Sequence, residues 1–491
     1  MKKALIIGSG IGGLATAVRL AVKGYAVEVF EASDHPGGKL SEKNLGGFRF
    51  DTGPSLFTLP ALVDELFLLA GKDPAQHFSY TRIPESCRYF WEDGFRLAAG
   101  SQPEDFAAAC AKTFSVPAED ILRYFAECKS MYDLTEGVFL ERSLHRAKNY
   151  LRKDVLRGVM NAWRLHLFRT MHQVHRKRMK SPHLVQLFDR FATYNGSDPY
   201  QAPGILSMIP HLEHNLGTFF PKGGMIDIPN VIYKLALELG VKFHFNAPVE
   251  TIITQNKKAS GIRVNGKEIT GDVVISNMDV VPTYRRLLPN EKAPEKSLQQ
   301  ERSSSALIFY WGISRQFPEL GLHNIFFSAD YEKEFRMLFK ENSVTDDPTV
   351  YIHISSKYCK TDAPDGKENW FILVNVPGNN GQDWDALIPQ IRANTIAKLS
   401  RMLNTDVASL IEQEDRWEPR TIERDTFSYQ GSLYGSASNN RYAAFLRHPN
   451  FSRRIPNLYF CGGSVHPGGG IPLCLRSAKI AADLILEDQS L

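Results

Sequence analysis

The sequence has little cysteine, and no two cysteines are close enough to suggest a shared site. Its six cysteines are scattered along 491 residues, and none forms a CxxC or CxxxxC pair. This spacing argues against a disulfide framework and against a metal site, so we expect neither. A reducing compartment such as the cytosol fits it best.

Long apolar runs are also missing. No stretch of eighteen apolar residues occurs, so a membrane-spanning helix is not expected. The first strand pattern starts at Lys2 or Lys3, which leaves no room for a signal peptide. No internal repeat, low-complexity tract or GxSxG nucleophile motif is present, so the sequence supports neither a repeat protein nor that class of hydrolase. The length predicts two or three structural units with room for a large cofactor.

Positive charge is concentrated in one segment. The net charge is only +4, but the residues from Arg142 to Lys180 include twelve lysines or arginines and one acid, Asp154. The remainder of the chain is therefore net negative. The basic segment is a local feature that needs a local explanation.

The N-terminus is the most informative part of the chain. An apolar run leads into a glycine-rich turn, a helical pattern and a second apolar run that ends at Glu31. This order predicts a dinucleotide-binding unit, in which Gly8 makes the tight turn, Gly10 lets the backbone approach a pyrophosphate and Gly13 allows close helix packing. We expect the Glu31 carboxylate to bind both hydroxyls of an unphosphorylated adenosine ribose.

A second glycine-rich block lies near the C-terminus. A strand predicted at 457–460 runs into Gly462 and Gly463, and then into glycines 468–470 before an amphipathic helix that continues to about Glu487. Backbone amides in such a loop can reach a ligand, and a helix N-terminus adds partial positive charge. We expect this loop to stabilise the anion that forms at one end of a bound cofactor.

The middle of the chain alternates between helical and strand patterns. Residues 100–190 are predicted to be mostly helical, whereas glycine turns and strands resume at about 205–250 and a buried strand follows at 272–276. Further strands that could build a broad sheet over a cavity are predicted at 306–311, 324–327, 349–354 and 370–376.

Five blocks of sequence carry a family resemblance. They are the N-terminal fingerprint, Pro36-Gly37-Gly38-Lys39, Asp51-Thr52-Gly53-Pro54, the pair 220–225 and 246–250, and the terminal block 457–472. Together they resemble the bacterial carotenoid desaturases of the phytoene desaturase family, within the flavin amine oxidase-like superfamily. The resemblance spans essentially the whole chain and implies FAD as the cofactor.

The resemblance implies an α/β protein of three parts. A Rossmann-type FAD-binding domain is expected from residues 1–75, 215–290 and 440–491. A mixed-sheet substrate domain is expected from residues 76–130 and 291–439. A helical, basic region that associates with membranes is expected from residues 131–214.

The resemblance also implies positions that bind FAD. Gly38 would lie along its ribityl and pyrophosphate chain, and Lys39 would supply charge near the phosphates or the flavin. Asp51 and Pro54 would shape the loop beneath the flavin, and Val249 would contact the adenine through its backbone. The other cofactor-binding positions are expected to be Ile11, Ala32, Gly53, Gly462, Gly463, Gly470, Ile471 and Pro472.

Lys39 departs from the commoner family pattern. Many members have arginine after the two glycines, and lysine lacks the planar fork of arginine. Lysine does occur in the subgroup of 3,4-desaturases that act on hydroxylated carotenoids. This residue, with the block that follows Asp51, favours that subgroup, although neutral drift in a surface loop would also explain it.

The predicted reaction is therefore FAD-dependent desaturation of a carotenoid, at C-3,4 of a 1-hydroxylated carotenoid such as 1′-hydroxy-γ-carotene. The flavin performs most of the chemistry, and His466 is a candidate for proton transfer. A loop histidine that is hydrogen-bonded to the backbone is the simpler interpretation. Alternative functions are phytoene desaturation, carotenoid isomerisation with reduced FAD, and a flavin-bearing protein that only binds polyenes. The electron acceptor is expected to be oxygen or a quinone.

The basic segment predicts a cationic helix with an apolar stripe. Such helices lie on anionic membrane surfaces, where a carotenoid substrate would be collected. A solvated helix that packs its stripe on the protein core is an alternative, and nucleic-acid binding is a weaker one. We expect a cytoplasmic protein that is peripheral on the inner face of the cytoplasmic membrane, with no nucleic-acid partner.

Overall fold

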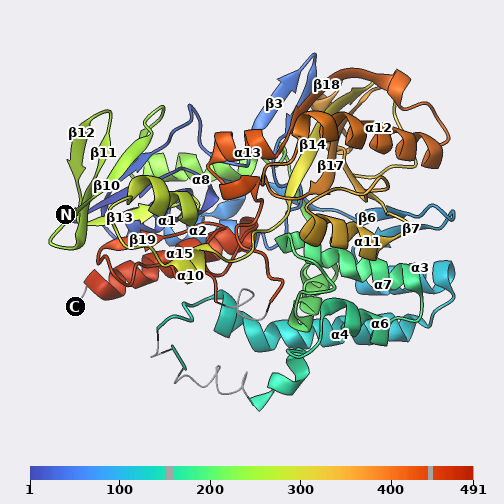
Figure 1. The fold of residues 1–491 in the computed structure, drawn as a ribbon, viewed down its shortest axis with the longest axis horizontal. Helices are drawn as coiled ribbons and strands as arrows, with labels where there is room; N and C mark the ends of the chain where they lie inside the picture. The colour runs from blue at the N-terminus through green and yellow to red at the C-terminus, as the bar shows by residue number, and fades with distance from the viewer. Residues whose placement is uncertain (147–148, 151–159, 441–445, 490–491) are drawn as a thin grey trace.

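The computed structural model describes residues 1–146, 149–150, 160–440 and 446–489. A parallel sheet with both chain ends beside it occupies one end of the molecule, on the left in Figure 1. A larger mixed sheet occupies the other end, above a layer of helices. The predicted α/β class with a Rossmann-type sheet and a second, mixed sheet is confirmed.

Five parallel strands form the sheet near the termini. In spatial order they are β19 (Leu458–Phe460), β13 (Val273–Ser276), β1 (Lys3–Ile7), β2 (Ala26–Phe30) and β9 (Lys242–His244). These strands come from widely separated parts of the chain, so the sheet is completed only by the C-terminal strand.

Strand β1 is apolar along most of its length because both faces of the sheet are covered. Ala4 and Ile6 share a core with the helices on one face, which are α1 (Ile11–Val22), α8 (Asp227–Glu238) and α15 (Ile471–Gln489). Leu5 and Ile7 share a second core with an antiparallel layer on the other face, made of β10 (Val249–Gln255), β11 (Lys258–Val264) and β12 (Lys267–Thr270). Helix α2 (Ala61–Leu69) extends the first core.

The larger sheet has seven strands. Their order is β18 (Ile411–Trp417), β14 (Ser305–Ile313), β17 (Glu368–Val376), β16 (Val350–His353), β15 (His323–Phe326), β6 (Glu85–Phe90) and β7 (Arg96–Gly100). Among the described strands of this sheet, only β15 and β6 pair in parallel. One face packs Phe309 and Trp311 against α12 (Trp384–Met402). The opposite face carries Ile308 and Tyr310 toward a cavity.

The four strands predicted between 306 and 376 are confirmed as β14, β15, β16 and β17. They form one sheet over a cavity, as expected. Two short strand pairs lie outside the main sheets, β3 (Glu42–Leu45) with β4 (Phe48–Asp51) and β5 (Tyr80–Arg82) with β8 (Phe219–Pro221).

Helices cover the β6–β7 end of the larger sheet (Figure 1). They are α3 (Pro103–Phe114), α4 (Ala118–Thr135), α6 (Met171–Arg178) and α7 (Pro182–Asp189). Phe106, Phe125 and Phe188 of this layer share a core with Tyr89 and Leu97 of the sheet. The prediction that residues 100–190 are mostly helical is confirmed for the described part of that range.

The expectation of one cationic helix across the basic segment is wrong where the structure describes it. The turn η4 (Ala162–Leu165) ends at His166, whose φ of 47° is incompatible with a continuing right-handed helix. The chain then starts α6 afresh, with Thr170 as its N-cap in a capping box. Residues 147–148 and 151–159 of the predicted helix lie outside the described residues.

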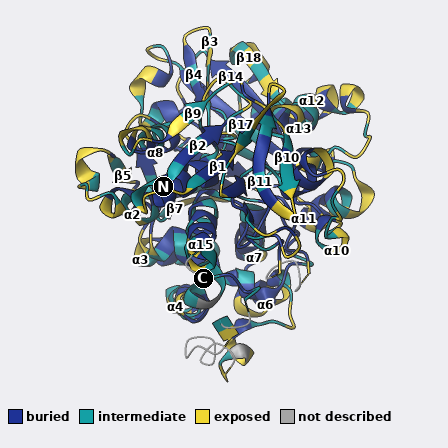
Figure 2. Ribbon diagram, turned by 90° about the vertical axis from the view of Figure 1, so that its left-hand side faces the viewer, coloured by how far each residue is buried: buried dark blue, intermediate teal, exposed yellow. Residues whose placement is uncertain are grey.

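The apolar residues of the basic segment point in two directions. Leu144 and Leu165 are buried, whereas Met160 and Trp163 are each 79% exposed and Phe168 is 84% exposed. Buried residues concentrate on the sheets, and exposed ones on the outer helices and turns (Figure 2). No helix within the described residues is long and apolar enough to cross a bilayer.

Candidate functional site

A cavity of about 1190 Å³ runs between the two sheets. It is larger than the ~300–1,000 Å³ of ordinary small-molecule pockets. Its wall begins at the glycine turn after β1 and continues along the inner face of the seven-stranded sheet. Most of the predicted site residues line it, namely Gly8, Gly10, Ile11, Glu31, Ala32, Gly38, Lys39, Gly53, Pro54, Val249, Gly462, Gly463, His466, Gly470, Ile471 and Pro472.

Two of the predicted residues lie away from the cavity wall. A Cβ atom at Gly13 would lie 2.1 Å from the carbonyl oxygen of Gly8, so this glycine lets α1 sit directly against the turn. Gly8 itself has a φ of 90°, which favours glycine. Asp51 is 2% exposed and accepts hydrogen bonds from the backbone N–H groups of Met225 at 2.9 Å and Ile226 at 3.1 Å. Asp51 thus ties β4 to the start of α8.

The Glu31 carboxylate is held against the glycine turn. Its Oε2 accepts hydrogen bonds from the Ser9 backbone N–H at 2.6 Å and the Ser9 hydroxyl at 2.8 Å. Its Oε1 accepts one from the Ser33 N–H at 3.0 Å. Val249 lines the same cavity. The contact of Ser9 with Glu31 was not predicted from the sequence, although the position of Ser9 inside the glycine motif could have indicated it.

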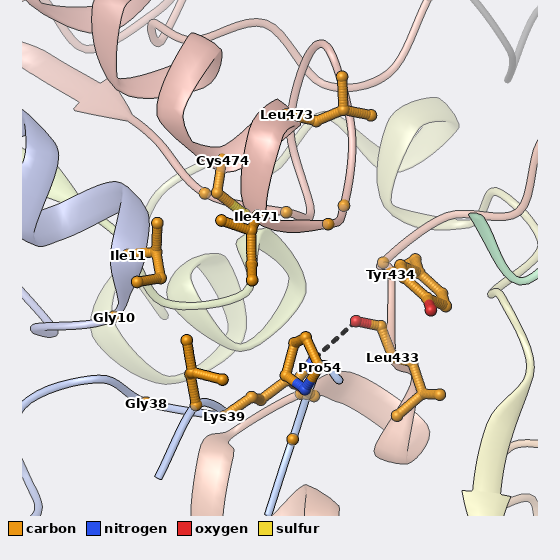
Figure 3. A pocket seen from close by; sticks show the side chains of 18 of the residues that line it. Gly10, Ile11, Gly38, Lys39, Pro54, Leu433, Tyr434, Ile471, Leu473 and Cys474 are labelled. Carbon is orange, nitrogen blue, oxygen red and sulfur yellow. Dashed lines mark hydrogen bonds between the residues drawn. The ribbon is translucent and has the colours of Figure 1, made fainter. Parts of the chain in front are cut away.

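Lys39 bridges two parts of the cavity wall. Its Nζ donates hydrogen bonds to the carbonyl oxygens of Ser432 at 3.0 Å and Leu433 at 2.9 Å, and Figure 3 shows the second bond. Burial lowers the pKa of Lys39 to about 8, although the Asp279 carboxylate partly opposes that change. The partners of Lys39 could not be found from the sequence, because no motif marks residues 432–433.

Pro54 and Leu433 face Ile471 and Ile11 across the cavity in Figure 3. Helix α15 begins at Ile471, directly after the glycine loop. The backbone of that loop lines the cavity at Gly469 and Gly470. The helix N-terminus therefore lies at the cavity wall, where its partial positive charge attracts an anionic group.

His466 is buried and neutral. It is 2% exposed, and burial lowers its pKa to about 3. Its Nε2 lies 2.8 Å from the carbonyl oxygen of Arg142. Because a carbonyl oxygen only accepts, Nε2 carries the proton in this contact. This is the backbone-bonded arrangement that the sequence offered as the simpler interpretation. A role in proton transfer stays a prediction.

A family model described as flavin containing amine oxidoreductase matches residues 11–486. The chain belongs to this family. The family assignment confirms the resemblance seen in the five sequence blocks, and the protein uses FAD as its cofactor.

Two curated relatives match nearly the full length of the chain. The chain is 52% identical over 485 residues to a 1-hydroxycarotenoid 3,4-desaturase from Flavobacterium sp. (strain P99-3), covering 99% of each sequence. It is 33% identical to a 4,4′-diapolycopene oxygenase from Methylomonas sp., covering 99% of this chain and 98% of the relative.

Solved structures share the fold of this chain. A putrescine oxidase bound to putrescine matches with a TM-score of 0.63 at 16% identity, covering 99% of each chain. An oxidoreductase from Methanosarcina mazei matches with a TM-score of 0.64 at 15% identity, covering 99% of this chain and all of the other. At these identities the likeness shows the fold alone.

The cavity residues fit FAD. The Glu31 carboxylate suits ribose hydroxyls, the glycine turn exposes its backbone, and the terminal loop brings a helix N-terminus to the wall. Near the turn, a Cβ atom at Gly38 would lie 3.2 Å from the Cα of Gly10, so the two backbones approach closely. Bulky side chains are thus absent at these two points of the wall.

Proposed function

We propose that this protein is an FAD-dependent carotenoid desaturase that forms the C-3,4 double bond of a 1-hydroxylated carotenoid such as 1′-hydroxy-γ-carotene. The observation that carries the proposal is the 52% identity, over 99% of both sequences, to a protein named 1-hydroxycarotenoid 3,4-desaturase. The cavity supports it, because its volume exceeds that of an ordinary small-molecule pocket.

We assign the cofactor-binding roles as the sequence predicts them. Glu31 would hold the adenosine ribose, the turn at Gly8 and Gly10 the pyrophosphate, and the terminal loop before Ile471 the anionic side of the flavin. Gly13 and Asp51 act by positioning the backbone, because neither lines the cavity. We also propose the three predicted domains, in which all of these cofactor-binding positions belong to the FAD-binding domain.

The wall beyond the flavin region suits a hydrocarbon chain. Apolar side chains line it from two opposed elements, the helical segment (Ile205, Leu206, Met208, Ile209, Leu212) and the sheet (Ile308, Ile325, Phe371, Leu373). Such a wall excludes water and holds a polyene in register. When bound, FAD supplies a two-electron oxidant that takes a hydride from an allylic C–H bond, and loss of a proton from the adjacent carbon completes the double bond.

His466 is the residue we assign to proton transfer at this wall. Because Nε2–H donates to the Arg142 carbonyl, Nδ1 is the nitrogen that accepts a proton in the neutral ring. The low pKa of His466 makes it a weak base, so this proton must leave an already acidic carbon beside a polyene cation.

The decisive experiment compares two substrates. Purified protein with FAD and liposomes is incubated separately with the 1-hydroxylated carotenoid and with phytoene, and products are read by mass and absorption. We expect the loss of two hydrogens and a red shift with the hydroxylated substrate alone. Turnover of phytoene would indicate an early-pathway desaturase. A product of unchanged mass with a new isomer composition would indicate an isomerase, and a product mass increased by oxygen would indicate an oxygenase. Hydrogen peroxide formation would identify oxygen as the acceptor, and dependence on an added quinone would identify the quinone.

We also propose that the protein is peripheral on the inner face of the cytoplasmic membrane. The exposed side chains of Met160, Trp163 and Phe168 support this, because they gather within nine residues of a basic segment. Tryptophan and arginine side chains suit the membrane interface, where an apolar body and a charge are both accommodated. The indole of Trp163 lies beside the Arg164 guanidinium, 6.0 Å from the ring centre.

Replacing Met160 and Trp163 together with serine is expected to weaken binding to anionic liposomes by about tenfold or more, since two large apolar contacts are lost. Co-sedimentation with liposomes measures this. The matched control is Leu68→Ser on α2, because Leu68 is also exposed, at 63%, but lies outside the basic segment. Undiminished binding by the double variant would remove the membrane assignment. Charge reversal at Arg178 or Lys180 is a poorer test, because these residues pair with Glu127 and Asp120.

A further inference from the structure

A polar cluster lies in the wall of a cavity that otherwise suits a hydrocarbon. It consists of Arg190, Tyr194, Glu213, His323 and Tyr351, all of which line the cavity. Arg190 follows α7, Glu213 lies in the turn η7 (His211–Asn215), and the last two belong to β15 and β16. Sequence motifs did not reveal this cluster, because its members come from four separate elements.

One half of the polar cluster is a buried ion pair between Arg190 and Glu213, which hydrogen bonds to tyrosine hydroxyls hold in place. Arg190 is 6% exposed and Glu213 is 1% exposed. The guanidinium donates to the Tyr89 hydroxyl at 2.8 Å and to the Tyr194 hydroxyl at 3.2 Å, and it lies 3.5 Å from Glu213 Oε2. The Tyr194 hydroxyl donates to the same Oε2. Glu213 Oε1 accepts no hydrogen bond among the described residues, and His214 Nε2 lies 3.8 Å from it.

The other half is a chain of two hydrogen bonds, here called the relay, that runs from Ser55 through Tyr351 to His323. The Ser55 hydroxyl lies 2.7 Å from the Tyr351 hydroxyl, which lies 2.7 Å from His323 Nδ1. His323 Nε2 is buried and, within the part of the chain that the structure describes, has no partner. Ser55 follows Pro54, so the relay starts at the loop assigned to the flavin and ends at His323, which lines the same cavity as the ion pair.

The charges of the polar cluster are settled by its surroundings. Burial alone would raise the pKa of Glu213, but the Arg190 charge and other neighbours outweigh it, so the pKa is lowered and the carboxylate is ionised at pH 7. Burial lowers the pKa of His323 well below its usual range, so its imidazole is neutral. A neutral imidazole nitrogen either donates or accepts, whereas the carboxylate oxygen only accepts.

A pure hydrocarbon gives these unpartnered atoms nothing to bind, and leaving them unpaired costs free energy. A tertiary hydroxyl offers one donor and two acceptor positions, which complements an acceptor at Glu213 and a donor or acceptor at His323. In a 1-hydroxylated carotenoid, the hydroxyl carbon is only two bonds from C-3. The group that binds the hydroxyl must therefore lie close to the flavin, and two successive hydrogen bonds connect His323 to Ser55 in the loop assigned to the flavin.

We propose that the polar cluster binds the C-1 hydroxyl of the carotenoid and thereby selects hydroxylated substrates. This inference rests on the proposed desaturase function and adds the residues that set its specificity. Arg190, Tyr194 and Tyr351 hold the two binding atoms in place, so they are positioning residues.

The test measures a ratio of specificity constants. Wild type, His323→Phe, Glu213→Gln and Tyr194→Phe are each assayed with the 1-hydroxylated carotenoid and with the same carotenoid lacking the hydroxyl. We expect wild type to prefer the hydroxylated substrate by ~100-fold or more, since a site built to bind a hydroxyl strongly rejects an analogue without it. In each variant the kcat/KM ratio should fall at least tenfold, mainly by loss on the hydroxylated substrate.

Tyr124→Phe is the matched control. Tyr124 is a buried tyrosine whose hydroxyl bonds to the Ser207 carbonyl at 3.2 Å, and it is outside the cavity lining. It should leave the ratio unchanged. FAD absorbance and circular dichroism confirm that each variant is folded.

Equal losses on both substrates in all three cluster variants would overturn the inference and leave the proposed function intact. If wild type turns over neither carotenoid, the proposed function fails, and binding then decides the inference. Quenching of tryptophan fluorescence by each polyene gives the dissociation constants. A wild-type preference for the hydroxylated polyene that the variants lose supports the inference, and equal affinities in wild type contradict it.

Discussion

Replacing Gly13 with alanine is expected to prevent the protein from retaining FAD and to lower its thermal stability markedly. The new Cβ atom would lie 2.1 Å from the Gly8 carbonyl oxygen and 3.2 Å from the Asn277 amide nitrogen. Helix α1 cannot keep its contact with the β1 turn, and overpacking of this kind costs about 1–3 kcal/mol or more. The bound flavin per protein, read from absorbance, should fall by more than about tenfold.

Gly321→Ala is the control for this prediction. Its Cβ atom would approach only the end of the flexible Glu85 side chain, at 2.7 Å, which can move aside. Flavin content and melting temperature should therefore stay close to those of wild type. The account of the glycine turn is wrong if the Gly13 and Gly321 variants behave alike.

Replacing Glu31 with glutamine is expected to weaken FAD binding by about 10- to 100-fold. The carboxylate already accepts three hydrogen bonds from Ser9 and Ser33, and the amide turns one of its two acceptors into a donor that faces these N–H and O–H groups. Loss of a charge-assisted hydrogen bond costs roughly 1.5–3 kcal/mol, which corresponds to that range. Titration of apoprotein with FAD, followed by flavin fluorescence, measures the dissociation constant.

Glu28→Gln gives the matched control, because Glu28 lies in strand β2, which ends directly before Glu31. Glu28 pairs with Lys3 at 2.7 Å and with His244 at 3.0 Å, and it does not line the cavity. Its replacement should leave the affinity for FAD unchanged. Wild-type affinity in the Glu31 variant would refute the assignment of Glu31 to the ribose.

The elements predicted best from the sequence are those whose pattern is contained in one continuous stretch of residues. Strand β1 and helix α1 were predictable because an apolar run, a glycine turn and a helical pattern follow one another without interruption. The inner strands β14 and β17 were predictable because nearly every residue is buried, which leaves an apolar run. Strand β18 was missed because it is an edge strand that alternates with charged residues, as in Glu412 and Glu414.

The candidate site divides in the same way. Positions in contiguous motifs, such as Gly10 and Gly470, were found on the cavity wall. Site residues that are brought together by long-range packing were not predicted. Nothing in the sequence around Arg190 or His323 indicates that both residues line one cavity. The prediction of one cationic helix was wrong for a local reason: His166 has a left-handed conformation, which ends a helical pattern that is continuous in the sequence.

The dependence of the parallel sheet on its last strand has a consequence for the synthesis of the protein. Strand β19 pairs with β13, and α15 packs on α1, so residues 458–489 complete a unit that begins at residue 3. While residues 458–489 are still inside the ribosomal exit tunnel, the sheet lacks its edge strand and α1 lacks the helix that packs on it. The nascent chain therefore closes this unit, and becomes able to load its flavin, only after these residues have left the tunnel.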